Sequence, residues 1–219
     1  MGVLDYITVA DLFSYPGADF VERVKKVQRL LLEQCPEAAA ELEEFAGVVS
    51  GMELWEIEEL YARSFDVQSA TTLDVGYVLF ADDYKRGELL ANLNGEHRRC
   101  DNDCGTELAD HLPNLLRLLA KLDDKELLEE LVQEIVAPAL RKMIREFDPE
   151  RTEEREKIYR RQYRTLLEPP PGKAAAYRSA LRALYTILKH DFSISEERRP
   201  WQSSDFLRVI STEMELEDS

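Results

Sequence analysis

Four side chains able to bind a metal or react with oxidants are concentrated in one stretch near the middle of the chain. His97, Cys100, Cys104 and His111 lie within fifteen consecutive positions. Zinc accepts two thiolates and two imidazoles in a tetrahedral site, so the residue types suit zinc. The spacing matches no common zinc motif, however, and a surface loop with two exposed cysteines is the simpler interpretation. Both interpretations stay open at this point.

The two loop cysteines also fit a redox role. A reactive thiol needs a lowered pKa, and the neighbouring Arg98 and Arg99 could lower the pKa of Cys100 or Cys104. A metal- or redox-responsive helical adaptor that uses the four residues of this stretch is therefore the alternative function that the sequence offers.

A second candidate is the element Asp110-His111-Leu-Pro113, which precedes an apolar run of helical periodicity. Asp110 fits the N-cap of a helix, and Pro113 fits its first turn, where the missing N–H has no partner within the helix. Asp110 and His111 could also form an acid–base couple. Capping needs fewer assumptions, yet it leaves the polar residues before Asp110 unexplained.

Signatures of common enzymes are absent from the sequence. It contains no Walker loop, no Gly-rich dinucleotide motif, no nucleophile elbow and no H-E-x-x-H motif. An all-helical metal phosphohydrolase needs several fixed histidine and carboxylate ligands, whereas this chain has three histidines. Together these absences disfavour an enzyme, although each is weak evidence by itself.

Composition favours helices over sheets. Of 219 residues, 44% are hydrophobic and 33% are charged, with only nine Gly and nine Pro. Apolar residues recur at helical spacing in most of the chain. The expected helices span residues 3–15, 18–33, 36–48, 53–65, 82–96, 110–120, 123–147 with a kink or break at Pro138, 150–167 and 173–190, with a surface loop over 95–105. Residues 1–192 are thus predicted to form one all-helical domain, and residues 193–219 a C-terminal tail that docks or stays mobile.

The expected location is the cytoplasm. No stretch free of Asp, Glu, Lys and Arg exceeds eight residues, which predicts no membrane span. The first residues lack the basic and apolar regions of a signal peptide. Three cysteines, Cys35, Cys100 and Cys104, do not form the disulfide framework of a secreted domain.

Charge narrows the class of partner. The net charge of −16 disfavours nucleic acid, whose phosphates would be repelled, and favours a neutral or basic partner. Nine Glu and no Lys or Arg occur between Leu30 and Ala62. This segment is either a solvated helix surface or a surface that attracts a cationic peptide, and the sequence supports both interpretations equally.

Several motifs together resemble a known family. Tyr61-Ala-Arg-Ser-Phe65-Asp66, the helix that contains Arg86-Gly87, Asp11-Leu-Phe-Ser-Tyr15-Pro16 and above all Glu107-Leu-Ala-Asp110-His111-Leu-Pro113 are similar to motifs of the nitrate-reductase assembly chaperones. These proteins are the NarJ branch of the TorD-like redox-enzyme maturation proteins. The resemblance runs from about Leu12 to Leu119. The chain differs from some relatives in two places. It has Ala109 where those relatives have a proline before Asp-His, and it has a cysteine-bearing loop.

The resemblance implies a TorD-like single-domain bundle of roughly nine helices. It further implies a chaperone that binds the basic N-terminal leader of a molybdoenzyme's catalytic subunit and holds that subunit for insertion of the molybdenum cofactor. The molybdopterin cofactor would be delivered to the client rather than bound permanently, and cofactor-biosynthesis proteins are further candidate partners. The peptide-binding residues carried over from the family motifs are Tyr61, Phe65, Asp66, Glu107, Asp110, His111 and Pro113.

Overall fold

A computed structural model describes residues 5–67, 69–148, 150–151, 176–192 and 194. Within these residues the chain is all-helical, which confirms the expected all-α class. The one β-type contact there is an isolated antiparallel bridge between Asp74 and His111. None of the described helices combines the length and apolar character needed to cross a membrane.

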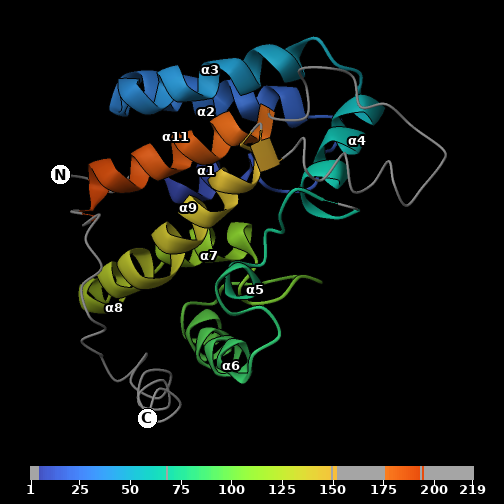
Figure 1. Cartoon of the computed structure of the whole chain (residues 1–219). Helices are drawn as coiled ribbons and strands as arrows, with labels where there is room; N and C mark the ends of the chain where they lie inside the picture. The colour runs from blue at the N-terminus through green and yellow to red at the C-terminus, as the bar shows by residue number, and fades with distance from the viewer. Residues whose placement is uncertain (1–4, 68, 149, 152–175, 193, 195–219) are drawn as a thin grey trace, which may run out of the picture.

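Two antiparallel helices, α2 (Phe20–Gln34) and α3 (Pro36–Ser50), form one end of the molecule (Figure 1). Pro36 begins α3 directly after the turn at Cys35, where its missing N–H costs no helical hydrogen bond. The last described helix, α11 (Ala176–Asp191), packs against α3, while α4 (Leu54–Phe65) stands beside them. This end of the fold therefore joins early and late parts of the chain.

Among the described helices, the most completely buried one lies at the centre. α7 (Leu112–Leu119) buries seven of its eight residues and packs against α1 (Tyr6–Ala10). α9 (Ala137–Glu146) contacts both α11 and α5 (Val75–Phe80), and so connects the two halves of the core. Burying each large apolar side chain contributes about 1.5–3 kcal/mol, so this continuous core dominates stability.

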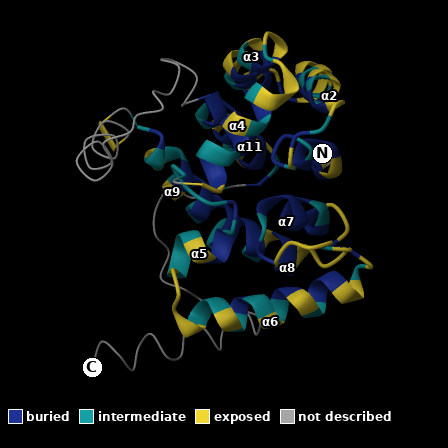
Figure 2. Cartoon of the chain, turned by 90° about the vertical axis from the view of Figure 1, so that its right-hand side faces the viewer, coloured by how far each residue is buried: buried dark blue, intermediate teal, exposed yellow. Residues whose placement is uncertain are grey.

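The opposite end consists of α5, α6 (Tyr84–Arg99) and α8 (Lys125–Glu130). Figure 2 shows α6 along the edge of the molecule, with exposed and half-buried residues over much of its surface. Leu89 and Leu93, one helical turn apart, are its fully buried apolar anchors. The polar composition of α6 thus agrees with its position at the edge.

The expected interruption at Pro138 is confirmed. A π-helical turn over Leu131–Val136 separates α8 from α9, and Pro138 is in the first turn of α9. A proline cannot donate the backbone hydrogen bond of an α-helix interior, so the preceding turn takes up the irregularity.

Two boundaries differ from the sequence-based expectation. The helix expected over 3–15 is the short α1, which is capped by Asp5 through a hydrogen bond from the Thr8 N–H (3.1 Å) and is followed by turns. The loop expected over 95–105 begins only at Cys100, because α6 continues to Arg99. The predicted helix over 150–167 and the predicted tail over 193–219 lie outside the described residues, except for 150–151 and 194.

Candidate functional site

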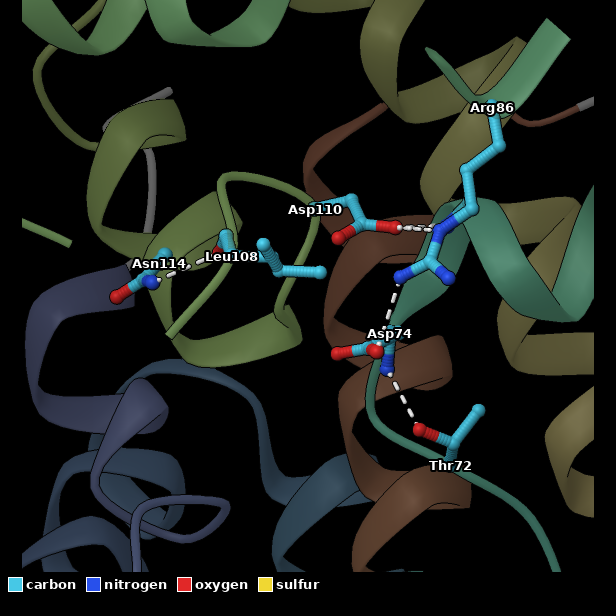
Figure 3. Close-up of polar contacts among 7 residues, drawn as sticks. Thr72, Asp74, Arg86, Leu108, Asp110 and Asn114 are labelled. Atoms are coloured by element: carbon cyan, nitrogen blue, oxygen red, sulfur yellow. Dashed lines mark hydrogen bonds and ion pairs between the residues drawn. The ribbon is translucent and has the colours of Figure 1, made fainter. Parts of the chain in front are cut away.

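Asp110 is a fully buried carboxylate that joins three segments of the chain. Its Oδ2 atom accepts hydrogen bonds from Arg86 Nε (3.0 Å) and from the Gly76 N–H (3.1 Å). Arg86 also donates through Nη2 to Asp74 Oδ2 at 3.0 Å, so one guanidinium bridges two carboxylates (Figure 3). Burial alone lowers the pKa of Arg86, but Asp110 and Asp74 outweigh it and leave that pKa raised.

The backbone explains why these groups meet. The Val75 N–H donates to the Asp110 carbonyl at 3.0 Å, and the Leu112 N–H donates to the Leu73 carbonyl at 2.9 Å. A Cβ atom at residue 76 would lie 2.7 Å from Asp110 Oδ2, so only glycine allows this approach. The start of α5 is therefore fixed against the start of α7.

This arrangement corrects the expected role of Asp110 as the N-cap of its own helix. α7 begins at Leu112, and the N-cap position belongs to His111, whose side chain makes no capping hydrogen bond. The Asp110 carboxylate instead binds the Gly76 N–H in the first turn of α5. Pro113 does lie in the first turn of α7, as expected. The local sequence identified a capping carboxylate but assigned it to the wrong helix.

A second buried network holds the loop over residues 100–111. His97 Nδ1 accepts from the Asn102 amide at 2.9 Å, and His97 Nε2 donates to the Ala109 carbonyl at 3.0 Å. The same amide donates to the Asn114 carbonyl (3.2 Å). Burial lowers the pKa of His97, which is consistent with a neutral ring in this network. Both ring nitrogens of His97 are therefore engaged inside the protein.

Asn114 extends this network towards the surface. Its side-chain amide donates to the carbonyls of Cys104 (3.2 Å) and Leu108 (3.1 Å; Figure 3). Its Oδ1 accepts from Arg117, whose other terminal nitrogen donates to Ser14 Oγ at 2.9 Å. The loop that carries Glu107 and the segment before Tyr15 are thus held by the same helix, α7.

The structure does not favour a metal or redox site at His97, Cys100, Cys104 and His111. Within the described residues, no group of three or more His, Cys, Asp or Glu side chains is placed to hold a metal ion. Burial raises the pKa of both Cys100 and Cys104, which is opposite to the shift expected from Arg98 and Arg99. Neither His97 nor the two thiols favours the metal- or redox-responsive alternative.

The accessible part of the predicted site combines carboxylates with apolar side chains. Val67, Leu108 and Tyr15 are 65%, 49% and 58% exposed, and each follows or adjoins a predicted site element. We call this set the acidic–apolar surface; it comprises Tyr15, Asp66, Val67, Glu107, Leu108 and His111.

Electrostatic interactions show that Asp66, Glu107 and His111 lie near one another. Burial and the nearby Glu107 raise the pKa of Asp66, while His111 opposes that shift. Burial lowers the pKa of His111, and Glu107, Asp74 and Asp110 oppose that effect. Residues from the end of α4 and from the loop before α7 therefore face one another across a short distance.

Tyr61 and Phe65 support this surface from below. Their rings are 5.3 Å apart; Tyr61 contacts the exposed Tyr15 at 5.3 Å and Phe65 contacts Tyr177 at 4.7 Å. Both side chains are 4% exposed, and burial raises the pKa of Tyr61. Of the seven predicted site residues, Tyr61, Phe65, Asp110 and Pro113 are buried, whereas Asp66, Glu107 and the half-buried His111 reach the surface.

Sequence reasoning missed the residues that connect the site. Arg86 was noted only within a motif, and Asp74, Asn102 and Asn114 were not singled out. Asn114 carried a detectable signal, because it is a polar residue on the otherwise apolar face of α7. Asp74 and Asn102 carried none, since each is one of several Asp and Asn residues in a polar segment and no periodicity sets it apart.

Comparison with models of known protein families and with curated proteins finds no match for this chain.

Proposed function

We propose that this chain is a cytoplasmic chaperone, not an enzyme, that binds the basic amphipathic leader of a molybdoenzyme's catalytic subunit. It would hold the subunit while the molybdenum cofactor is inserted, and it would deliver that cofactor rather than keep it. The observation that carries the proposal is the acidic–apolar surface, where exposed hydrophobic side chains lie among carboxylates. An amphipathic cationic helix offers the complementary pattern.

The charge around this surface matches a basic peptide. Burial raises the pKa of Asp66, and the negative charge of the nearby Glu107 raises it further. Glu59, seven residues before Asp66, is exposed on α4 but pairs with Arg63 (2.7 Å), so it adds little net charge to the surface. Charges such as those of Asp66 and Glu107 increase the association rate more than they increase the final affinity.

The apolar side chains provide the affinity. Tyr15, Val67 and Leu108 are each about half exposed or more, so a partner could bury substantial area on each. Full burial of one such side chain contributes about 1.5–3 kcal/mol, and micromolar binding requires about 8 kcal/mol after ordering costs. Three partly exposed anchors together with several charge pairs suit micromolar affinity.

The family resemblance suggests the class of client, the catalytic subunit of a molybdoenzyme. Its motifs contribute Asp66, Glu107 and His111 to the surface and contribute Tyr61 and Phe65 to the layer beneath it. Residues from two separated motifs thus belong to one structural unit, which supports the proposal without identifying the molybdoenzyme.

The test is a titration of a labelled synthetic molybdoenzyme leader with the full chain, at about 50 mM and about 500 mM NaCl, where screening differs strongly. We expect micromolar affinity at low salt and weaker binding at high salt. Absence of binding to every molybdoenzyme leader tried, at either salt concentration, would overturn the proposal.

Paired variants locate the binding surface. Asp66→Asn with Glu107→Gln should weaken low-salt binding about tenfold, or about 1.4 kcal/mol, and reduce its salt dependence. The matched control, Glu33→Gln with Glu37→Gln, changes two exposed glutamates at the α2–α3 turn, at the far end of α3 from α4. The control should bind as the unmodified protein does.

A second pair of variants tests the apolar contribution. Val67→Ser with Leu108→Ser should weaken binding at both salt concentrations, because it removes apolar area that the bound leader would bury and leaves the charge unchanged. Leu32→Ser is the control, since Leu32 is 65% exposed on α2. Equal losses in the surface variants and in their controls would show that binding does not use this surface.

A further inference from the structure

A hollow of about 540 Å³ lies between the segment that leads into α5 and the end of α9. Its lining combines cationic side chains, hydroxyl groups and one apolar wall: Ser69, Thr71, Thr72, Tyr77, Val78, Lys142, Arg145, Glu146 and Arg151. We infer that this pocket binds a small organic phosphate. The inference is independent of the proposed leader binding, which uses a different set of residues.

The lining is basic although the protein is strongly acidic. Three cations and one carboxylate line the pocket of a chain whose net charge is −16. Arg151 pairs with Glu146, the one carboxylate of the lining. Lys142 and Arg145 remain as an excess of positive charge at the pocket.

The hydrogen bonds of these two cations leave them available to an anion. Lys142 Nζ donates to the carbonyls of Val78 (3.3 Å) and Leu79 (3.2 Å), and Arg145 Nε donates to the Arg141 carbonyl (3.3 Å). Neither cation has a carboxylate partner among the described residues. The carbonyls hold Lys142 over the pocket without neutralising its charge.

The hydroxyl groups stand on a segment that is held in place. The N–H groups of Ala70 and Thr71 donate to the carbonyls of Arg63 and Ser64, at the end of α4. Thr72 Oγ1 accepts from the Asp74 N–H at 3.2 Å, which leaves its own hydrogen free to donate to a ligand (Figure 3). Preorganised donors bind at a lower entropic cost.

A simpler explanation accounts for only part of this pattern. Cations in the last turns of α9 interact favourably with the negative end of the helix dipole. That effect does not explain why three hydroxyl-bearing residues and Tyr77 face the same hollow. Several N–H⁺ and O–H donors around one space suit a phosphoryl group, which carries a charge of about −1.5 to −2 and three strong acceptor oxygens.

The size and the apolar wall indicate an organic ligand rather than inorganic phosphate alone. The volume falls within the range of about 300–1,000 Å³ that is typical of small-molecule sites. Val78 and the ring of Tyr77 can contact a sugar or another organic group. Tyr77 also lies under Arg86, whose guanidinium carbon is 5.3 Å from the ring centroid, so the pocket adjoins the Asp74–Arg86–Asp110 cluster.

The test is isothermal titration of the full chain with ribose 5-phosphate, inorganic pyrophosphate, inorganic phosphate and ribose. We expect ribose 5-phosphate and pyrophosphate to bind with dissociation constants in the millimolar range or below. Ribose should not bind, and inorganic phosphate should bind more weakly. Absence of binding by ribose 5-phosphate would overturn the inference, whether or not pyrophosphate binds.

Variants assign the binding to this pocket. Lys142→Gln with Arg145→Gln should weaken binding at least tenfold, whereas Lys26→Gln with Arg29→Gln, an exposed Lys/Arg pair on α2, should not. Thr71→Val removes one hydroxyl and keeps the side-chain shape, so it should weaken binding several-fold even if the charge variant is poorly folded. Equal loss in both charge pairs would indicate non-specific attraction and contradict the inference.

A phosphoserine peptide distinguishes the source of the phosphoryl group. If the pocket takes a small ligand, the peptide should bind no more tightly than ribose 5-phosphate. Tighter binding of the peptide, lost in the Lys142/Arg145 variant, would overturn the small-molecule assignment in favour of a phosphorylated partner.

Discussion

At Asp110, a buried carboxylate connects segments that are 34 residues apart in sequence, through the Gly76 N–H. The Arg86 guanidinium supplies its counter-charge at 3.0 Å and reaches Asp74 with another nitrogen. Hydrogen bonds to charged groups are roughly twice as strong as neutral ones, but an unpaired buried charge is costly. Each partner therefore depends on the other.

A double-mutant cycle measures this dependence. Arg86→Ala should lower the free energy of unfolding by about 3–5 kcal/mol, since it leaves the buried Asp110 without its counter-charge. Asp110→Ala should lower it less, by about 1–3 kcal/mol, because Arg86 keeps its ion pair with Asp74. The double variant should lose less than the sum, with a coupling of about 0.5–3 kcal/mol. Urea denaturation provides the values, and Asp82→Asn, at an exposed site, serves as the control. Strict additivity would contradict the proposed pairing.

The buried imidazole of His97 should make stability depend on pH. Burial lowers its folded-state pKa below the ordinary value of 6.5. As the pH falls below 6.5, the unfolded chain binds more protons than the folded protein does. The contribution of neutral His97 to the free energy of unfolding is therefore fully present above pH 6.5 and is lost as the pH falls to the folded-state pKa. His111 acts in the same direction.

Thermal or urea unfolding between pH 7.5 and pH 5.5 tests this expectation. Unmodified protein should lose stability as the pH falls, whereas His97→Gln, although less stable at pH 7.5, should show a shallower pH dependence. Parallel pH profiles would mean that His97 takes no part in the effect.

The loop over residues 100–111 keeps its shape through side chains of the helices on either side of it. His97 comes from the end of α6 and Asn114 from α7, and both form hydrogen bonds to the loop backbone. A connection with little regular structure thereby presents Glu107 and Leu108 at a fixed place.

Removing this support should loosen the loop and weaken leader binding together. Asn114→Ala leaves the carbonyls of Cys104 and Leu108 without their donor and should cost about 1–3 kcal/mol. Hydrogen exchange of the loop amides should accelerate more than that of α7. Asn94→Ala, at an exposed position of α6, should leave both exchange and stability nearly unchanged. Faster exchange across the whole protein would instead indicate global destabilisation.

For the molecule as a whole, the helix that comes last in the described sequence lies within the core. α11 packs against α3 on one side and α9 on the other, and thus joins the end formed by α2 and α3 to the centre of the molecule. Unfolding should therefore be a single cooperative transition over the described residues, with no layer stable by itself.

Two substitutions on α11 test this arrangement. Leu184 is fully buried, and Leu184→Ala should cost about 2–5 kcal/mol because it leaves a cavity. Arg182 forms a surface ion pair with Glu41 at 2.7 Å, and Arg182→Ala should cost no more than about 1 kcal/mol. Denaturant unfolding followed by circular dichroism and by tryptophan fluorescence should give coincident transitions. Separate transitions would contradict a single cooperative core.

The sequence by itself determined the all-α class, most helix positions and the break near Pro138, because helical periodicity and proline chemistry are local properties. It also grouped Asp66, Glu107 and His111 as candidate binding residues, a prediction that still awaits its binding test. Only the tertiary structure decided that Asp110 caps α5 rather than its own helix and that Arg86 and Asp74 join it. Likewise, only the tertiary structure showed that His97 forms a hydrogen bond to the loop backbone and that Lys142 and Arg145 line the same pocket as the hydroxyl groups. These contacts join residues from different segments of the chain. The partner, the burial and the pKa of each of these side chains therefore depend on how the segments pack in space rather than on the spacing of residues in the sequence.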